Sequence, residues 1–241
     1  LTLTADQAYG IAKRKDAAAA DFNGDGVIDL KSEMVFGPAY YAAAFDRSGS
    51  KSTNYLNTIM QAYMDGRMLI TAANGAILTN EQRSSLKGYA SIIESNWELV
   101  LAEATFKYAG SVYKDIVKMS EEGADKDKIY RAYVKHWGEL KGFSMALQSG
   151  RNNLGEVAAK MNELILFGPV TLDNSYVTGL TSDGGFDRKS RMTWNDYQLN
   201  LLKVQQMMVD KFSVSSRVND QLADLGALAE KLSAESNAET D

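Results

Sequence analysis

The chain has 241 residues, of which 45% are hydrophobic, and a formal net charge of −5. This length allows one large domain or two small ones, and the negative charge argues against non-specific nucleic-acid binding, which needs a basic face. The absence of cysteine excludes disulfides, thiol catalysis and zinc–thiolate sites, and no apolar run approaches the roughly 18 residues of a membrane span.

Residues 1–20 are predicted to form an N-terminal helix, since residues 4–19 are rich in alanine. The chain starts with Leu1 rather than methionine. We therefore expect a processed product or a fragment, from which any signal peptide has already been removed.

Residues 21–33 are predicted to form an EF-hand-like calcium loop. Oxygen-bearing side chains stand at positions one, three, five and nine, and these residues are Asp21, Asn23, Asp25 and Asp29. Gly26 stands at position six, and Val27 at position seven offers its backbone carbonyl. Calcium takes about six to eight oxygen ligands, which such a loop supplies around one sharp glycine turn. Position twelve is Ser32 instead of the expected glutamate, so we predict that Glu33 closes the site.

The same residues also suit an Asp/Asn/Gly-rich turn in which Asp29 caps the following helix. Both interpretations can hold together, because a calcium loop normally leads into a helix. Neither makes an enzyme, since a closed calcium site made only of protein ligands usually has a structural role.

Residues 34–212 are predicted to form a helical bundle. Apolar residues recur at steps of three and four, which places them on one face of each helix. The longest pattern runs from 80 to 119, unless Gly88 or Gly110 interrupts it. Pro38 either bends a helix over 30–46 or starts a new one. The other predicted helices cover residues 52–74, 126–148, 153–166 and, with Thr193 as N-cap, 193–212.

Strand signals are few. Residues 170–172 and 176–178 suit short extended pieces in a loop rich in Gly, Asp and Ser, but no alternating run is long enough to build a sheet. Residues 213–241 are predicted to form a C-terminal helix, about 217–235, and an acidic tail. Helix packing is then the only way to bury the apolar faces, so we predict a single all-α domain, an antiparallel up-and-down helical bundle.

The only histidine, His136, lies three residues before Glu139. On a helix this spacing puts both side chains on one face, where they can bind a transition metal or exchange protons. The alternative is a packed, hydrogen-bonded histidine beside Trp137. No serine motif accompanies the histidine, so nothing supports nucleophilic catalysis.

One stretch reads DFNGDGVIDLKSEMVFG over residues 21–37, and a second reads AAAFDR over residues 42–47. Both resemble segments of an imelysin-like family of uncharacterised exported lipoproteins of Gram-negative bacteria. The resemblance continues through residues 59–67, 92–98 and 139–147, and it spans about residues 7–212 in all. The family pattern also places the loop glutamate one residue late, in the position of Glu33.

The resemblance implies an all-α fold, export to the periplasm or cell surface, and a link to iron uptake. It also implies a metal site of the form Gly-x-His-x-x-Glu. Only His136 and Glu139 fit that motif here, with Val134 in the glycine position. The family's own histidine segment would lie upstream of residue 7.

Two classes of function follow. The first is an exported, non-enzymatic protein that binds calcium structurally and acts by binding or assembly, as a homo-oligomer or with a surface or iron-uptake partner protein. The second is an iron-handling protein or metal-dependent peptidase that uses His136 and Glu139.

Overall fold

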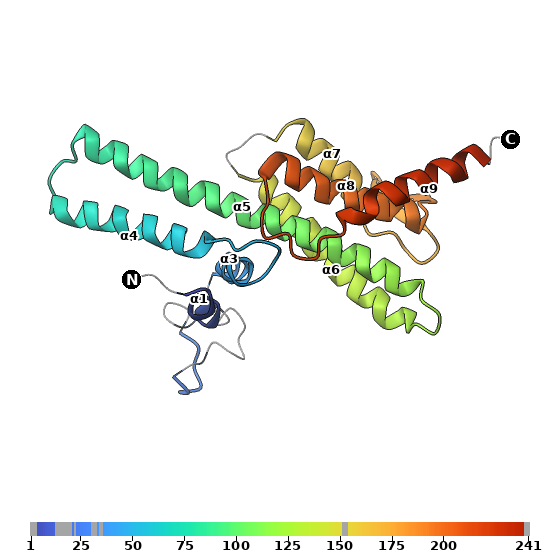
Figure 1. The fold of residues 1–241 in the computed structure, drawn as a ribbon, viewed down its shortest axis with the longest axis horizontal. Helices are drawn as coiled ribbons and strands as arrows, with labels where there is room; N and C mark the ends of the chain where they lie inside the picture. The colour runs from blue at the N-terminus through green and yellow to red at the C-terminus, as the bar shows by residue number, and fades with distance from the viewer. Residues whose placement is uncertain are drawn as a thin grey trace. The chain divides into compact units, whose positions relative to one another are not determined.

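The computed structural model describes residues 4–12, 21, 23–29, 33, 36–150 and 154–238 (Figure 1). The chain divides into two compact units, unit 1 with residues Leu1–Leu101 and unit 2 with residues Ala102–Asp241. Helix α5 (Asn80–Met119) runs through the boundary without a break, and Gly88 and Gly110 do not interrupt it. The expectation of a single helical domain stays a prediction.

Unit 1 contains α1 (Ala5–Ala12), α3 (Gly37–Arg47), α4 (Tyr55–Ala73) and the first part of α5. Pro38 lies in the first turn of α3, where its missing N–H is not needed, so it starts this helix rather than bending one. The predicted helix over 4–19 is helical over α1, and its remainder lies outside the described residues. The fully or nearly fully buried apolar side chains of α3 and α4 include Ala42, Ala43, Phe45, Ile59 and Ala62.

Unit 2 contains the second part of α5, α6 (Lys126–Gln148), α7 (Glu156–Ile165), α8 (Trp194–Phe212), the 3₁₀ turn η2 (Leu222–Asp224) and α9 (Leu225–Ala238). The second part of α5 and α6 run antiparallel across a short turn (Figure 1). The largest side chains that are fully buried in this unit are Phe106, Tyr133, Leu140, Leu147, Met161, Ile165, Tyr197, Leu201, Leu202 and Met208.

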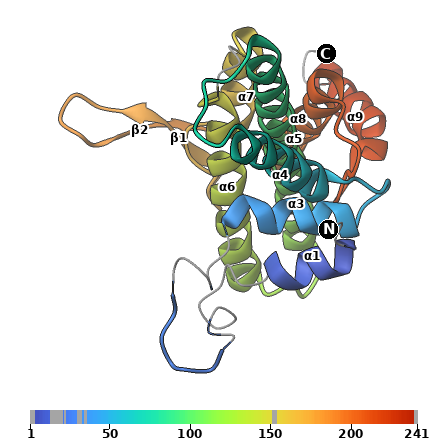
Figure 2. The ribbon, with the colours of Figure 1, turned by 90° about the vertical axis from the view of Figure 1, so that its left-hand side faces the viewer.

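The expectation that no sheet forms is wrong. Strands β1 (Ser175–Leu180) and β2 (Phe186–Ser190) pair antiparallel, with Ser175 opposite Ser190 and an irregularity between Val177 and Gly179. The hairpin extends away from the helices of unit 2 (Figure 2). Because β1 is at most half-buried and the described side chains of β2 are exposed, no buried face imposes the alternation of apolar residues by which strands are recognised.

Of the two expected extended pieces, only residues 176–178 lie in a strand. Residues 170–172 instead lead into a turn, in which the Asp173 carboxylate accepts hydrogen bonds from the hydroxyls of Thr171 (2.5 Å) and Ser175 (2.8 Å). Apart from the hairpin, the regular structure of the described residues is helical, which confirms the prediction of an all-α fold at that level. No described helix is long and apolar enough to cross a membrane.

Candidate metal centre

The loop of residues 21–29 is organised by hydrogen bonds from its own backbone to acidic and amide side chains. Both carboxylate oxygens of Asp21 accept, one from Gly24 N (2.9 Å) and one from Gly26 N (3.0 Å). Asn23 Oδ1 accepts from Asp25 N (2.9 Å). Asn23 thus forms an Asx-type turn with the residue two positions on, and Asp21 holds the backbone of Gly24 and Gly26 against its carboxylate.

Two glycines make this path possible. Gly24 has a φ of +76° and Gly26 a φ of +80°, both in the left-handed region that side chains with a Cβ rarely adopt. Gly26 is the glycine at position six of the predicted calcium loop. The local conformation therefore follows from the same residues that motivated the prediction.

Glu33 lies at the far end of the predicted site. Its backbone N–H donates to Asp29 O (2.8 Å), and its Oε2 accepts from Asp29 N (2.8 Å). The residue is only 1% exposed, and its other carboxylate oxygen, Oε1, is buried with no hydrogen-bond partner among the residues that the structure describes. An unpartnered buried carboxylate oxygen is costly in free energy, since it has lost water and gained nothing in exchange.

The oxygen atoms of the loop are of the kind that calcium prefers, but its described carboxylates do not surround one point. Across the residues that the structure describes, no three His, Asp or Glu side chains lie close enough together to hold a metal ion. Residues 30–32 lie outside the described part of the chain, so the expectation that Asp29 caps a helix stays a prediction.

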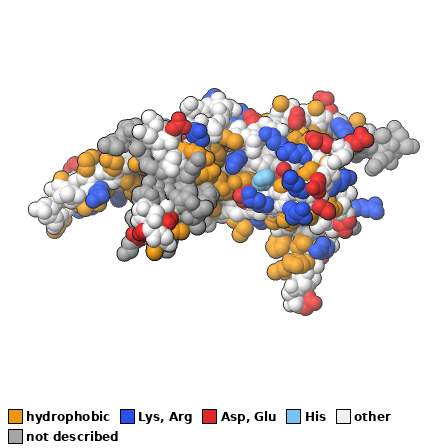
Figure 3. All heavy atoms as spheres, turned by 90° about the horizontal axis from the view of Figure 1, so that it is seen from below, with side chains coloured by type: hydrophobic (Ala, Val, Ile, Leu, Met, Phe, Trp, Pro, Cys, Tyr) orange, Lys and Arg blue, Asp and Glu red, His pale blue; other side chains and the backbone are white. Residues whose placement is uncertain are grey.

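His136 is part of a pair that links two helices of unit 2. Its Nδ1 lies 2.5 Å from Oδ2 of Asp115 on α5, and the Asp115 side chain is 7% exposed against 28% for His136. Figure 3 shows this histidine at the surface among side chains of both charges. Sequence spacing pointed to Glu139 and missed Asp115, because the partner comes from another helix, 21 residues earlier in the chain.

Glu139 lies one turn after Lys135, and the Lys135 Nζ is 3.9 Å from its Oε1. The other oxygen of Glu139, Oε2, is buried with no partner among the described residues. The described side chains do not complete a three-residue metal set around His136.

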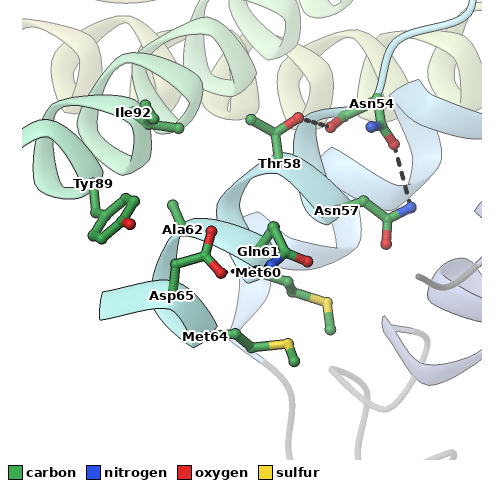
Figure 4. Close-up of a pocket in the computed structure, with 10 residues that line it drawn as sticks. All are labelled: Asn54, Asn57, Thr58, Met60, Gln61, Ala62, Met64, Asp65, Tyr89 and Ile92. Atoms are coloured by element: carbon green, nitrogen blue, oxygen red, sulfur yellow. Dashed lines mark hydrogen bonds between the residues drawn. The ribbon is translucent and has the colours of Figure 1, made fainter. Parts of the chain in front are cut away.

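Two grooves flank the contact between α4 and the first part of α5 in unit 1. One, of about 360 Å³, has a polar wall in which Gln61 donates to Asp65 (2.7 Å), facing Tyr89 and Ile92 across the groove (Figure 4). The other, of about 370 Å³, is more apolar and opens beside Tyr63. Neither contains a pair of groups arranged for acid–base or nucleophilic chemistry.

A third groove, of about 510 Å³, lies in unit 2 among α6, α7 and β1. Lys141 is at its edge, and burial lowers the pKa of its ammonium group. The Lys141 Nζ donates to the carbonyl of Leu166 (2.8 Å), just after the end of α7, while Trp137 and Tyr197 both donate to the carbonyl of Ile165. Lys141 therefore caps a helix, a role that its sequence context did not suggest.

Sequence patterns also missed the carboxylate that anchors the segment after α8. Glu103 on α5 is fully buried and accepts hydrogen bonds from three successive backbone N–H groups, those of Ser215 (2.6 Å), Ser216 (2.6 Å) and Arg217 (3.0 Å). The only sequence signal was an acidic residue on the apolar face of a long helix. This carboxylate is fully engaged in holding the fold.

Comparisons with protein-family models, with curated proteins and with solved structures gave no match. The resemblance to imelysin-like proteins stays a prediction.

Proposed function

We propose that this chain is a non-enzymatic calcium-binding protein in which residues 21–33 hold a structural calcium ion. The observation that carries the proposal is the Oε1 atom of Glu33. This buried carboxylate oxygen has no partner among the described residues, and it lies at the closing end of a loop with two Asx-type turns. A bound cation would give this oxygen a partner, and a hard divalent cation prefers carboxylate, amide and carbonyl oxygens.

The ligands we assign are the side chains of Asp21, Asn23, Asp25, Asp29 and Glu33 and the carbonyl of Val27. Oxygens that accept a backbone N–H keep further lone pairs for a cation. The N–H groups of Gly24 and Gly26 orient Asp21, and that of Val27 orients Asp25 (2.8 Å). Bound calcium would supply the positive charge that lets these carboxylates approach one another.

A site of this kind stabilises the fold without doing chemistry. In this proposal the chain is exported, where extracellular calcium fills even weak sites, and it acts by binding or assembly as a mostly helical, imelysin-like protein. Up-and-down packing of its helices and a surface or iron-uptake partner belong to the same proposal.

Thermal unfolding with and without calcium tests this function. Calcium added to chelator-treated protein is expected to raise the melting temperature, since a ligand at a hundredfold excess over its Kd stabilises by about 2.7 kcal/mol. Glu33→Gln should lose most of this gain. Glu163→Gln is the matched control, because Glu163 is an exposed residue paired with Lys160 on α7. A melting temperature that changes with neither calcium nor chelator would contradict the proposal.

One observation favours the alternative, an iron-handling protein or metal-dependent peptidase at His136 and Glu139. A histidine held through Nδ1 by a buried carboxylate, here Asp115, presents its Nε2 in the way that metal-binding histidines often do. Elemental analysis separates the two functions. A stoichiometric transition metal that is lost in His136→Ala would support the alternative, and calcium alone would exclude it.

A further inference from the structure

The hairpin of α4 and residues 80–101 of α5, both within unit 1, has a core only near its base. The last buried residues of α4 are Ala62 and Gly66, and Gly66 faces Leu86 and Tyr89 of α5. Beyond this point, none of residues 67–99 is buried. The apolar stripes of these two amphipathic helices therefore stay largely exposed to water, although burial of such stripes is what normally stabilises packed helices.

The open side of the hairpin is an apolar groove of about 370 Å³. Tyr63 and Ile70 on α4 line it and are 58% and 56% exposed, and Ala90 and Ile93 line it from α5. Apolar side chains are visible along this hairpin at the left of Figure 3. A groove between two helices that lie side by side can accept another helix pair, which would complete a four-helix arrangement.

The charges beside the groove indicate which helix pair fits. Arg83, Lys87, Glu94 and Glu98 are spaced by four, seven and four residues, close to whole helical turns, so they form one stripe on α5. The stripe is basic toward the tip of the hairpin and acidic toward its base. When two copies of α5 lie antiparallel, the basic part of each stripe therefore faces the acidic part of the other.

The match is residue by residue. In an antiparallel pair of α5 helices centred just after Ala90, Lys87 of one copy lies level with Glu94 of the other, and Arg83 with Glu98. Both pairs share the same centre, as a two-fold axis requires. Arg83 also donates to Asn80 Oδ1 (2.8 Å), which leaves its charge in place.

We propose that the α4–α5 hairpin binds a second copy of this chain in antiparallel orientation, and that it closes the apolar groove around Tyr63, Ile70 and Ile93. Apolar burial supplies the affinity, and the charge stripe fixes the orientation. The proposal does not depend on calcium binding.

Sedimentation equilibrium on the full chain tests it. The wild type is expected to form a dimer of about twice its 26.4 kDa mass. The double substitution Arg83→Glu with Lys87→Glu should raise the dimer dissociation constant at least tenfold. Adding Glu94→Lys and Glu98→Lys to that variant restores the complementary stripe and should restore the dimer.

Two further variants separate a specific interface from general charge or folding effects. Lys128→Glu with Arg131→Glu changes the same net charge at exposed positions of α6 and should leave the dimer intact. Ile70→Gln should weaken the dimer while circular dichroism stays unchanged, because Ile70 is exposed in one copy. A wild type that stays monomeric would overturn the proposal and leave the groove to a different protein. A dimer that the first charge reversal does not weaken, or that the fourfold exchange does not restore, would overturn it as well.

Discussion

Gly110 shows how one position of α5 decides whether the segment after α8 can pack. A Cβ atom added there would lie 1.9 Å from Asn219 O and 2.6 Å from Gln205 Nε2. The same Gln205 amide donates to Asn219 O and to Phe106 O, each at 3.0 Å. The backbone of this segment therefore lies directly against the bare face of the helix.

We predict opposite signs for two chemically identical substitutions in α5. Gly110→Ala should lower the free energy of unfolding by about 1–3 kcal/mol, because overpacking outweighs the better helix propensity of alanine. Gly88→Ala, where a new Cβ meets nothing within 4 Å, should raise it by about 0.5–1 kcal/mol. Urea unfolding of both variants checks the contrast. Equal effects would show that propensity alone governs these positions.

From the raised pKa of Tyr113, also on α5, we predict that the protein loses stability at high pH. Burial raises the pKa of Tyr113 from 10.0 to about 12, together with the carboxylate of Asp224, which accepts a hydrogen bond from the Tyr113 hydroxyl (3.0 Å). Above pH 10 the unfolded chain releases this proton and the folded chain keeps it, so stability falls as the pH rises from 10 toward 12.

Urea unfolding across this range should show a shallower decline in Tyr113→Phe than in the wild type. Tyr176→Phe, which changes a half-buried tyrosine of β1 outside the proposed dimer groove, is the control and should follow the wild type. An identical decline in all three proteins would show that the pKa of Tyr113 is not raised in the folded protein.

At the scale of elements, helices with readable caps were predicted best. The expected bounds 80–119, 126–148 and 193–212 coincide with those of α5, α6 and α8 to within a residue. Two of these helices begin at side-chain caps. The predicted N-cap Thr193 accepts a hydrogen bond from Asp196 N through its Oγ1 (3.1 Å), and Asp125, for which no cap was predicted, accepts from Lys128 N through its Oδ1 (3.1 Å). Such signals are local, and so they survive without knowledge of the fold.

The elements that sequence missed depend on distant or solvent-facing contacts. The β1–β2 hairpin has little buried face to reveal it, and the anchoring bonds of Glu103 reach residues more than 110 positions away. Asp115 and His136 meet only because α5 and α6 pack together. In each case the information lies in the pairing of elements, which periodicity cannot supply.

Asp46 caps α4 from the neighbouring helix, and its loss should fray that helix. Its carboxylate accepts from Thr53 Oγ1 (2.7 Å), Tyr55 N (2.7 Å) and Leu56 N (2.9 Å). Asn54, at the N-cap itself, makes no side-chain capping bond. Asp46→Ala should therefore cost about 1–3 kcal/mol.

Hydrogen exchange locates this effect. The amides of Tyr55 and Leu56 should exchange faster in Asp46→Ala, and those of α6 should not. Asp65→Ala is the control, since Asp65 lies within α4 and pairs only with the nearby Gln61 among the described contacts. Unchanged exchange at Tyr55 and Leu56 would contradict a capping role.

For the whole molecule, the two units share one continuous helix but differ in the chemistry they carry. The candidate calcium loop and the open helical hairpin belong to unit 1, and the His136 pair and the largest fully buried aromatic side chains, Tyr133 and Tyr197, belong to unit 2. Proteins open locally in parts whose stabilities differ, and a ligand protects only the states in which its site is intact.

Calcium is therefore expected to slow hydrogen exchange in residues 21–33 and in α3 of unit 1, while the amides of α6 and α8 in unit 2 keep their rates. The expected pattern follows from the proposed site, where two hydrogen bonds already join Glu33 and Asp29. Mass spectrometry of exchanged peptides, with and without chelator, measures it. Glu33→Gln should abolish the difference and His136→Ala should not. Protection spread evenly over both units would contradict a single calcium loop and point instead to weak binding across the acidic surface.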